Sequence, residues 1–339
     1  MAADDLLRAR RLAARIRFSG DAPGGGECAP VSAEAVRQFH LINELNISPA
    51  VTPLLYKNLN IALKNIFIPP RAVTAFVYAS SEMQASCFPG DHGDGCIIRF
   101  SSALVDILDA DEFKFVAGHE LGHFLFAHRP PKSAAKRSGL EYLILQRARE
   151  ISCDRMGLVA CGSLEIAIRA MMKTISGLTG EHLRFDVGAF MSQLRRVSGD
   201  AAEQVWQTTH PPVLVRCRAL LRFSSDIRNA DGVGNFSRAS AARLDEKIRD
   251  DLDKYVDGPA RERIAAAKQK VRMWAAARDI AADGVFDKKG QEKFAAEFGH
   301  DNLEKMKRFL RMPKSKIRGA VAAKLKDAER ELKTLIPAD

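Results

Sequence analysis

The segment VAGHELGHFLFAHRP, residues 116–130, constrains the fold of this chain more than any other stretch. It is mainly apolar, as expected of a helix that lies inside a protein, and Pro130 marks its end. Yet it also carries His119, Glu120 and His123 on consecutive turns. Because buried polar side chains need partners, the fold must bring polar groups from another element against this helix.

Patterning along the chain predicts a predominantly helical α+β fold with a small three-stranded sheet. Residues 72–101 are rich in β-branched and aromatic side chains and contain a Gly/Asp turn, which favours three short strands. Helical periodicity dominates elsewhere, and residues 240–339 are almost wholly helical by composition. We predict three parts: an N-terminal helix and Gly-rich linker at 1–31, a main domain at 32–225, and a helical C-terminal accessory region at 226–339.

The spacing of the two histidines favours a metal site. His119 and His123 are four residues apart, so on a helix they lie one turn apart on the same face, where two neutral imidazoles can bind one zinc ion. Glu120 lies about 100° further round the helix, where it can reach a water molecule on that ion rather than the ion itself. Taken alone, this HExxH pattern is equally compatible with a buried structural histidine and a surface glutamate.

A second predicted helix, from Leu140 to about Ala160, supplies acidic partners. Glu150 and Asp154 are one turn apart on it, and the short connection predicts that the two helices pack antiparallel. Glu150 can then be the third zinc ligand, and Asp154 can accept a hydrogen bond from a ligand histidine. The alternative is an exposed acidic face paired with Arg147 or Arg149.

His128 is expected to lie outside this site. It follows His119 by nine residues, which places it roughly on the opposite face of a continuous helix. We predict a structural role for it.

Four ordered motifs resemble those of the M48 family of gluzincin metallopeptidases. AGHELGHF, EISCD and THPPVLVR resemble the three main signatures, and QASCFPG with CIIRFSSALVDIL resembles the edge strand and the helix that follows it. The resemblance covers about residues 35–225. The chain departs from the family pattern at Gln84, where Asn is usual, and at Ser86, where an aromatic residue is usual, so the substrate preference stays open.

The resemblance implies a zincin-like catalytic core in which the helix pair holds one Zn²⁺ ion per chain. It implies that His119, His123 and Glu150 bind the metal, that Glu120 is the general base, and that Asp154 supports a ligand histidine. No stretch between the motifs could cross a bilayer, so the chain resembles a soluble, minimal form of the family.

Further site residues follow from the same resemblance. His210 would either stabilise the tetrahedral oxyanion or close over the zinc, although a turn role before Pro211 is the alternative. Arg216 matches the family's arginine, which orders its loop or binds an acidic group. The substrate would lie extended along an edge strand and pair through its main chain. That strand comprises Ala85, Ser86, Cys87 and Phe88.

Charge and composition limit the partners and the location. The net charge is +10. Nine Lys and Arg side chains lie between Lys305 and Lys326, a segment without acidic residues. This segment could bind an acidic partner or a membrane surface. The simpler alternative is a solvated helical bundle. Phe309 is its one aromatic residue, which argues against nucleic-acid binding. With no signal-peptide pattern and scattered cysteines, a cytoplasmic location is expected, with peripheral membrane attachment as the alternative.

Two functions are consistent with these patterns. The first is a zinc-dependent endopeptidase that hydrolyses extended or unfolded protein substrates. The second is a catalytically silent zinc-binding relative whose basic C-terminal region binds partners.

Overall fold

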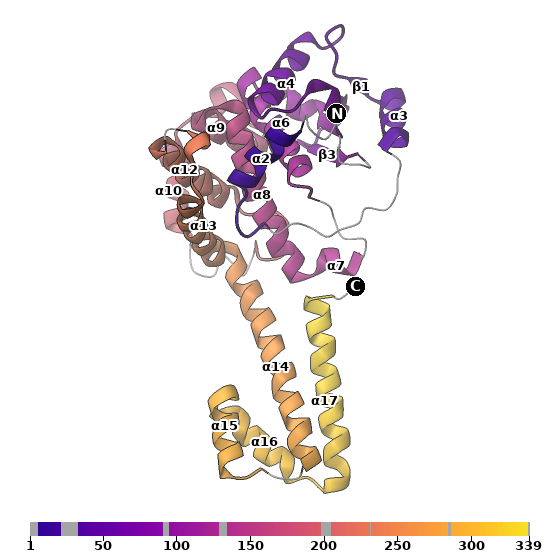
Figure 1. The fold of residues 1–339 in the computed structure, drawn as a ribbon, viewed down its shortest axis with the longest axis vertical. Coiled ribbons are helices and arrows are strands. Elements are labelled where there is room, and N and C mark those ends of the chain that lie inside the picture. The colour runs from indigo at the N-terminus through magenta and orange to yellow at the C-terminus, as the bar shows by residue number, and fades with distance from the viewer. Residues whose placement is uncertain are drawn as a thin grey trace. The chain divides into compact units, whose positions relative to one another are not determined.

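The computed structural model describes residues 6–21, 33–90, 95–128, 134–197, 205–230, 232–283 and 286–337. The chain divides into two compact units, and each is described here by itself (Figure 1). Unit 1 comprises Met1–Lys132 and Leu143–Asp257, and unit 2 comprises Ser133–Tyr142 and Gly258–Asp339.

Unit 1 is a mostly helical α+β structure, which confirms the predicted fold class. Its α-helices are α2 (Leu7–Ile16), α3 (Ala33–Asn43), α4 (Pro53–Asn65), α5 (Ser102–Ile107), α6 (Ala110–Leu125), α8 (Leu140–Cys161, from its residue 143 on), α9 (Leu164–Ser176), α10 (Val187–Ser192), α12 (Val213–Asn229) and α13 (Arg238–Leu252). Shorter helical turns are η1 (Pro70–Ala72), η2 (Gly180–His182), η3 (Gln193–Arg196), η4 (Val233–Asn235) and the π-helical η5 (Asp253–Asp257).

The sheet of unit 1 has four strands rather than the predicted three. In the order β1-β2-β4-β3 these are Leu45–Asn46, Val73–Tyr78, Cys96–Ser101 and Ala85–Pro89. β2 and β4 are parallel, whereas β1 and β3 are antiparallel to their neighbours. β3 is therefore an edge strand, as predicted, and it packs against α6.

Helix α6 has strong local signals at both ends. The side chain of Asp109 accepts hydrogen bonds from the backbone at the first turn, and the Asp109 N–H donates to Oε2 of Glu112 over 2.8 Å, which completes a capping box. At the other end Ala127 adopts a left-handed conformation with φ 55°. The His128 N–H then donates to the carbonyl of His123 over 2.9 Å, so the chain turns back on the helix in a Schellman motif.

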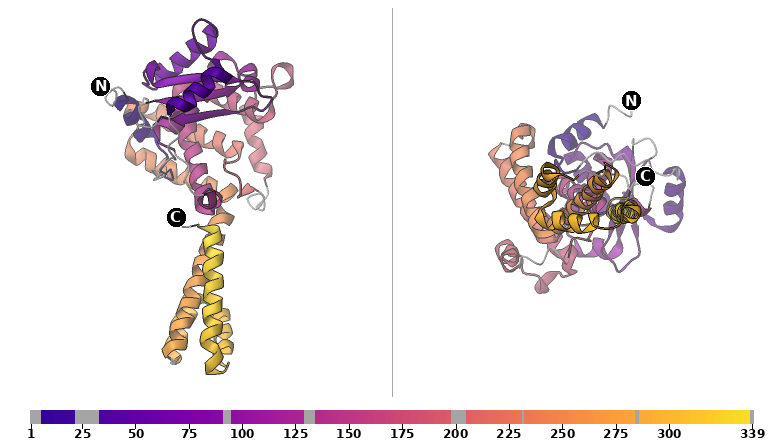
Figure 2. Two further views of the ribbon diagram at one scale, coloured as in Figure 1. Left: turned by 90° about the vertical axis from the view of Figure 1, so that its right-hand side faces the viewer. Right: turned by 90° about the horizontal axis from the view of Figure 1, so that it is seen from below.

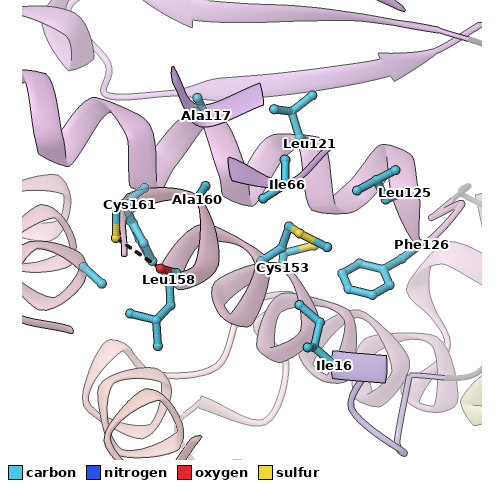
Figure 3. Close-up of a cluster of buried hydrophobic side chains, with 14 of the residues drawn as sticks. Ile16, Ile66, Ala117, Leu121, Leu125, Phe126, Cys153, Leu158, Ala160 and Cys161 are labelled. Atoms are coloured by element: carbon cyan, nitrogen blue, oxygen red, sulfur yellow. Dashed lines mark hydrogen bonds between the residues drawn. The ribbon is translucent and has the colours of Figure 1, made fainter. Parts of the chain in front are cut away.

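Glycines let α6 and α8 approach closely in the predicted antiparallel arrangement. A Cβ at Gly118 would lie 2.3 Å from the Cβ of Ala160, and a Cβ at Gly122 would lie 3.0 Å from the Cα of Cys153. Figure 3 shows part of the surrounding apolar cluster, which includes Ala117, Leu121 and Leu125 of α6 and Cys153 and Ala160 of α8. This packing sets the separation between the two predicted ligand-bearing helices.

Replacing Gly118 by Ala is expected to destabilise unit 1, although Ala favours helix. The added methyl group meets Ala160 and the backbone at Gly157, so the helices must separate, at a cost of about 1–3 kcal/mol. Chemical denaturation measures this loss. Gly188→Ala in α10 is the control, because the nearest atom to its Cβ is 3.4 Å away and no loss is expected. Equal stability of the Gly118 variant and the wild type would contradict the proposed close contact.

The N-terminal segment is part of the core of unit 1. Ile16 and Phe18 are fully or almost fully buried, and Figure 3 places Ile16 near the α6–α8 interface. The guanidinium of Arg17 donates to the carbonyl of Phe126 over 2.6 Å. The N–H of Ser19 donates to Asp245 over 2.8 Å. These contacts fix residues 17–21 beside the end of α6.

Unit 2 is helical and has its own apolar core. It contains α7 (Ala134–Ser138), α14 (Gly258–Asp283), α15 (Lys288–Phe298), α16 (His300–Leu310) and α17 (Lys314–Leu335). Helices α14 and α17 run side by side (Figure 1 and Figure 2). The cations of α16 and α17 described between Lys305 and Lys326 are largely exposed, and their partner stays a prediction. Among the described residues, no helix has the length and apolar character needed to cross a membrane.

Candidate metal centre

Helices α6 and α8 bring two imidazoles and one carboxylate together. Nε2 of His119 lies 3.3 Å from Oε2 of Glu150, and Nε2 of His123 lies 3.5 Å from Oε1 of the same carboxylate. Donor atoms that share one tetrahedral zinc ion at about 2.1 Å are about 3.4 Å apart, so these spacings fit a common cation. Oε2 of Glu150 is also buried, and its closest polar neighbours among the described residues are His119 at 3.3 Å and Arg216 at 3.6 Å, neither in a well-formed hydrogen bond. The donor set therefore fits a metal ion.

Asp154 supports His119 from the other side of the ring. Its Oδ1 lies 3.0 Å from Nδ1 of His119, which leaves Nε2 directed at Glu150. Arg216 of α12 donates to both oxygens of Asp154 over 2.8 and 2.6 Å, and lies 3.6 Å from Glu150. Arg216 thus contacts the acidic groups of the site.

The charges of the site depend strongly on one another. Burial opposes protonation of His119, but the carboxylates of Glu150 and Asp154 outweigh it and raise its pKa to about 10. Burial lowers the pKa of His123 to about 3. Burial disfavours the charged form of Glu150, yet His119 and Arg216 hold its pKa well below the usual value. A metal ion that binds here must displace the proton of His119.

Cys153 offers an alternative third donor. Ligand atoms of His119, His123 and Cys153 all lie within 4.8 Å of one another. However, Sγ of Cys153 lies 3.6 Å from Nδ1 of His128, a nitrogen that faces Nδ1 of His123. Burial raises the pKa of the Cys153 thiol well above its usual value in the metal-free protein, and a bound metal ion would have to displace its proton. The contacts of Sγ with His128, and those of the Glu150 carboxylate with both Nε2 atoms, favour Glu150 as the third donor.

Glu120 lines a pocket of about 350 Å³ together with His119 and Glu150. Burial raises the pKa of its carboxyl to about 7. The apolar wall of the pocket is formed by Met83, Leu104, Phe115, Val116, Met171 and Ile175. The pocket thus combines a titratable carboxyl group with an apolar surface.

Some of the remaining predicted site residues line this pocket and others do not. His210 lines it and is mostly exposed, with Nε2 3.7 Å from Oε1 of Glu150. Ala85 of the edge strand also lines it, whereas Ser86, Cys87 and Phe88 are not among its lining residues. Arg147, the proposed alternative partner of the acidic pair, instead binds Asp257 over 2.6 Å.

His128 lies in the site, and the prediction that placed it on the opposite face is wrong. Its Nδ1 is 3.1 Å from Nδ1 of His123, and its Nε2 is 2.9 Å from Oδ2 of Asp21. The continuous helix assumed for the prediction ends at Leu125, and the left-handed Ala127 turns His128 back toward His123. Asp21 was missed as well, because nothing local in the sequence pairs it with a residue 107 positions away.

Together these groups define a candidate metal centre with an acidic side chain beside an apolar pocket. Residues 52–137 match the model of Peptidase family M48, so the chain carries an M48 peptidase domain over these residues. The match includes His119, Glu120 and His123 but ends before Glu150. No curated protein and no solved structure matches the chain.

Proposed function

We propose that the chain is a zinc-dependent endopeptidase that cleaves extended or unfolded protein substrates. One observation carries the proposal: the two imidazole Nε2 atoms lie 3.3 and 3.5 Å from the carboxylate of Glu150, which shares a pocket with Glu120. The M48 match over the first two histidines supports zinc as the metal and peptide bonds as the target.

In this proposal His119, His123 and Glu150 hold the zinc ion. When bound, zinc supplies Lewis acidity, which lowers the pKa of a coordinated water and polarises a carbonyl group. Glu120 takes a proton from the attacking water and delivers it to the leaving amine. Its pKa of about 7 in the metal-free protein suits a group that both accepts and donates a proton near neutral pH.

The surrounding residues orient these groups. Asp154 holds His119 with Nδ1 as the donor, and Arg216 keeps the carboxylate of Asp154 charged and in place. His210, which is mostly exposed beside Glu150, is proposed to stabilise the oxyanion of the tetrahedral intermediate. The substrate is proposed to pair with the free edge of β3 at Ala85–Phe88. Backbone pairing of this kind tolerates many side chains and so suits unfolded chains.

Removal and return of the metal test this function. The zinc-loaded protein is expected to cleave an unfolded protein such as denatured casein. A chelator should abolish cleavage, and one equivalent of zinc should restore it. The readout is the appearance of new peptide termini by mass spectrometry. A protein that binds one zinc ion but cleaves no unfolded substrate would instead support the catalytically silent alternative.

A further inference from the structure

The second imidazole of the centre is connected to a carboxylate from the N-terminal segment. Oδ2 of Asp21 lies 2.9 Å from Nε2 of His128, and Nδ1 of His128 lies 3.1 Å from Nδ1 of His123. Asp21 lies outside residues 52–137, the range of the family match. The three side chains form a row, hereafter the Asp21–His128–His123 chain.

The donors and acceptors of this row can be assigned from simple chemistry. An ionised carboxylate only accepts hydrogen bonds, so Nε2 of His128 must carry the hydrogen that faces Asp21. A neutral imidazole has one donor and one acceptor, so Nδ1 of His128 is then the acceptor. The ring nitrogen that faces it, Nδ1 of His123, must therefore carry a hydrogen.

A second neighbour agrees with this assignment. Sγ of Cys153 lies 3.6 Å from the same Nδ1 of His128. A thiol that keeps its hydrogen can act as a weak donor, so this contact is compatible with Nδ1 of His128 as the acceptor.

We propose that Asp21 and His128 are positioning residues that fix the tautomer of His123 and leave its Nε2 free for the metal. The inference rests on the proposed role of His123 as a ligand. His119 has a direct carboxylate partner in Asp154, whereas His123 receives the same support through one intervening imidazole. The row is buried at Asp21 and His128, so water does not replace these partners readily.

Asp21→Asn tests the proposal with little change in size. The amide offers both a donor and an acceptor, so it no longer dictates which nitrogen of His128 carries the hydrogen. Zinc affinity, measured by competition with a chromophoric chelator, is expected to fall about 10- to 100-fold, the usual effect of losing an outer partner of a metal ligand. In the metal-free variant, ¹⁵N NMR of the ring nitrogens should show His123 redistributed between both tautomers.

The matched control is Asp245→Asn. Asp245 also accepts a hydrogen bond from the N-terminal segment, at Ser19, and another from Arg155, but it is not a member of the Asp21–His128–His123 chain. This variant should keep the wild-type tautomer of His123 and a near wild-type zinc affinity, even where it lowers the unfolding temperature. An equal loss of zinc affinity in both variants would show general loosening of the segment and overturn the proposal.

Two further outcomes keep the inference separate from the proposed function. If Asp21→Asn fails to fold, the ¹⁵N NMR spectrum of the metal-free wild type is sufficient as a test. A hydrogen on Nε2 of His123 in that spectrum would overturn the proposal. A wild type with the expected tautomer that binds zinc through His123 but hydrolyses nothing supports the inference and contradicts the endopeptidase. If His123→Ala left the zinc affinity unchanged, His123 would not be a metal ligand, and this inference would be wrong as well.

Discussion

Replacing Glu120 by Gln is expected to abolish peptide hydrolysis while zinc stays bound. The amide keeps the size of the side chain but cannot take a proton from water, so kcat should fall by about 10²- to 10⁴-fold, the contribution typical of a positioned general base. Glu120 is not among the proposed ligands, so the zinc content should match the wild type. Cleavage of an unfolded substrate and metal analysis of the same preparation measure both quantities.

A matched substitution controls for the chemistry of the change. Glu165→Gln removes a carboxylate from α9 that pairs with Arg169 at an exposed position, and kcat should not change. If the Glu120 variant and the wild type cleave equally at equal zinc content, Glu120 is not the base. The lost activity in the variant would also exclude a contaminating protease as the source of cleavage.

Glu150→Gln is expected to have the largest effect on metal binding. The carboxylate lies within 3.5 Å of Nε2 of both histidines, and a neutral amide is a poor zinc ligand. Zinc affinity should fall by more than about 100-fold, beyond the 10- to 100-fold loss caused by outer partners. Competition with a chelator measures the change, and hydrolysis should be lost with the metal.

Cys153→Ser decides between the two candidate third donors. If Glu150 is the ligand, this substitution should leave zinc affinity close to the wild-type value, since Sγ faces His128. If Cys153 is the ligand, Cys153→Ser should lose more zinc affinity than Glu150→Gln. Cobalt substitution adds an independent readout, because a thiolate ligand gives a charge-transfer absorption that a carboxylate does not.

The sequence predicted the helix pair because its signals are local. Spacings of four residues fix which side chains share a helix face, and the short connection between two long helices favours antiparallel packing. The structure confirms both helices, their antiparallel contact and the mostly helical α+β class. The roles assigned to the site residues stay predictions until the variants above are measured.

Other features depend on contacts that no local pattern records. β1 has two residues, Leu45 and Asn46, and exists because they pair with Val77 and Phe76 of β2. Such a strand is too short to show an alternating pattern. His128 was misplaced because Ala127, a residue without special preference for positive φ, ends the helix where a glycine would have signalled it.

The contacts that residues 17–21 make at the C-terminal end of α6 bear on how the protein can be shortened. A version trimmed to the family match at 52–137 would keep both imidazoles and Glu120. It would discard Asp21 upstream and every group on α8 and α12 downstream, and it would leave the α8-facing side of the helix open to water. Anyone designing a shorter or crystallisable form of this chain should therefore start from residues 6–257, in which all these groups are retained.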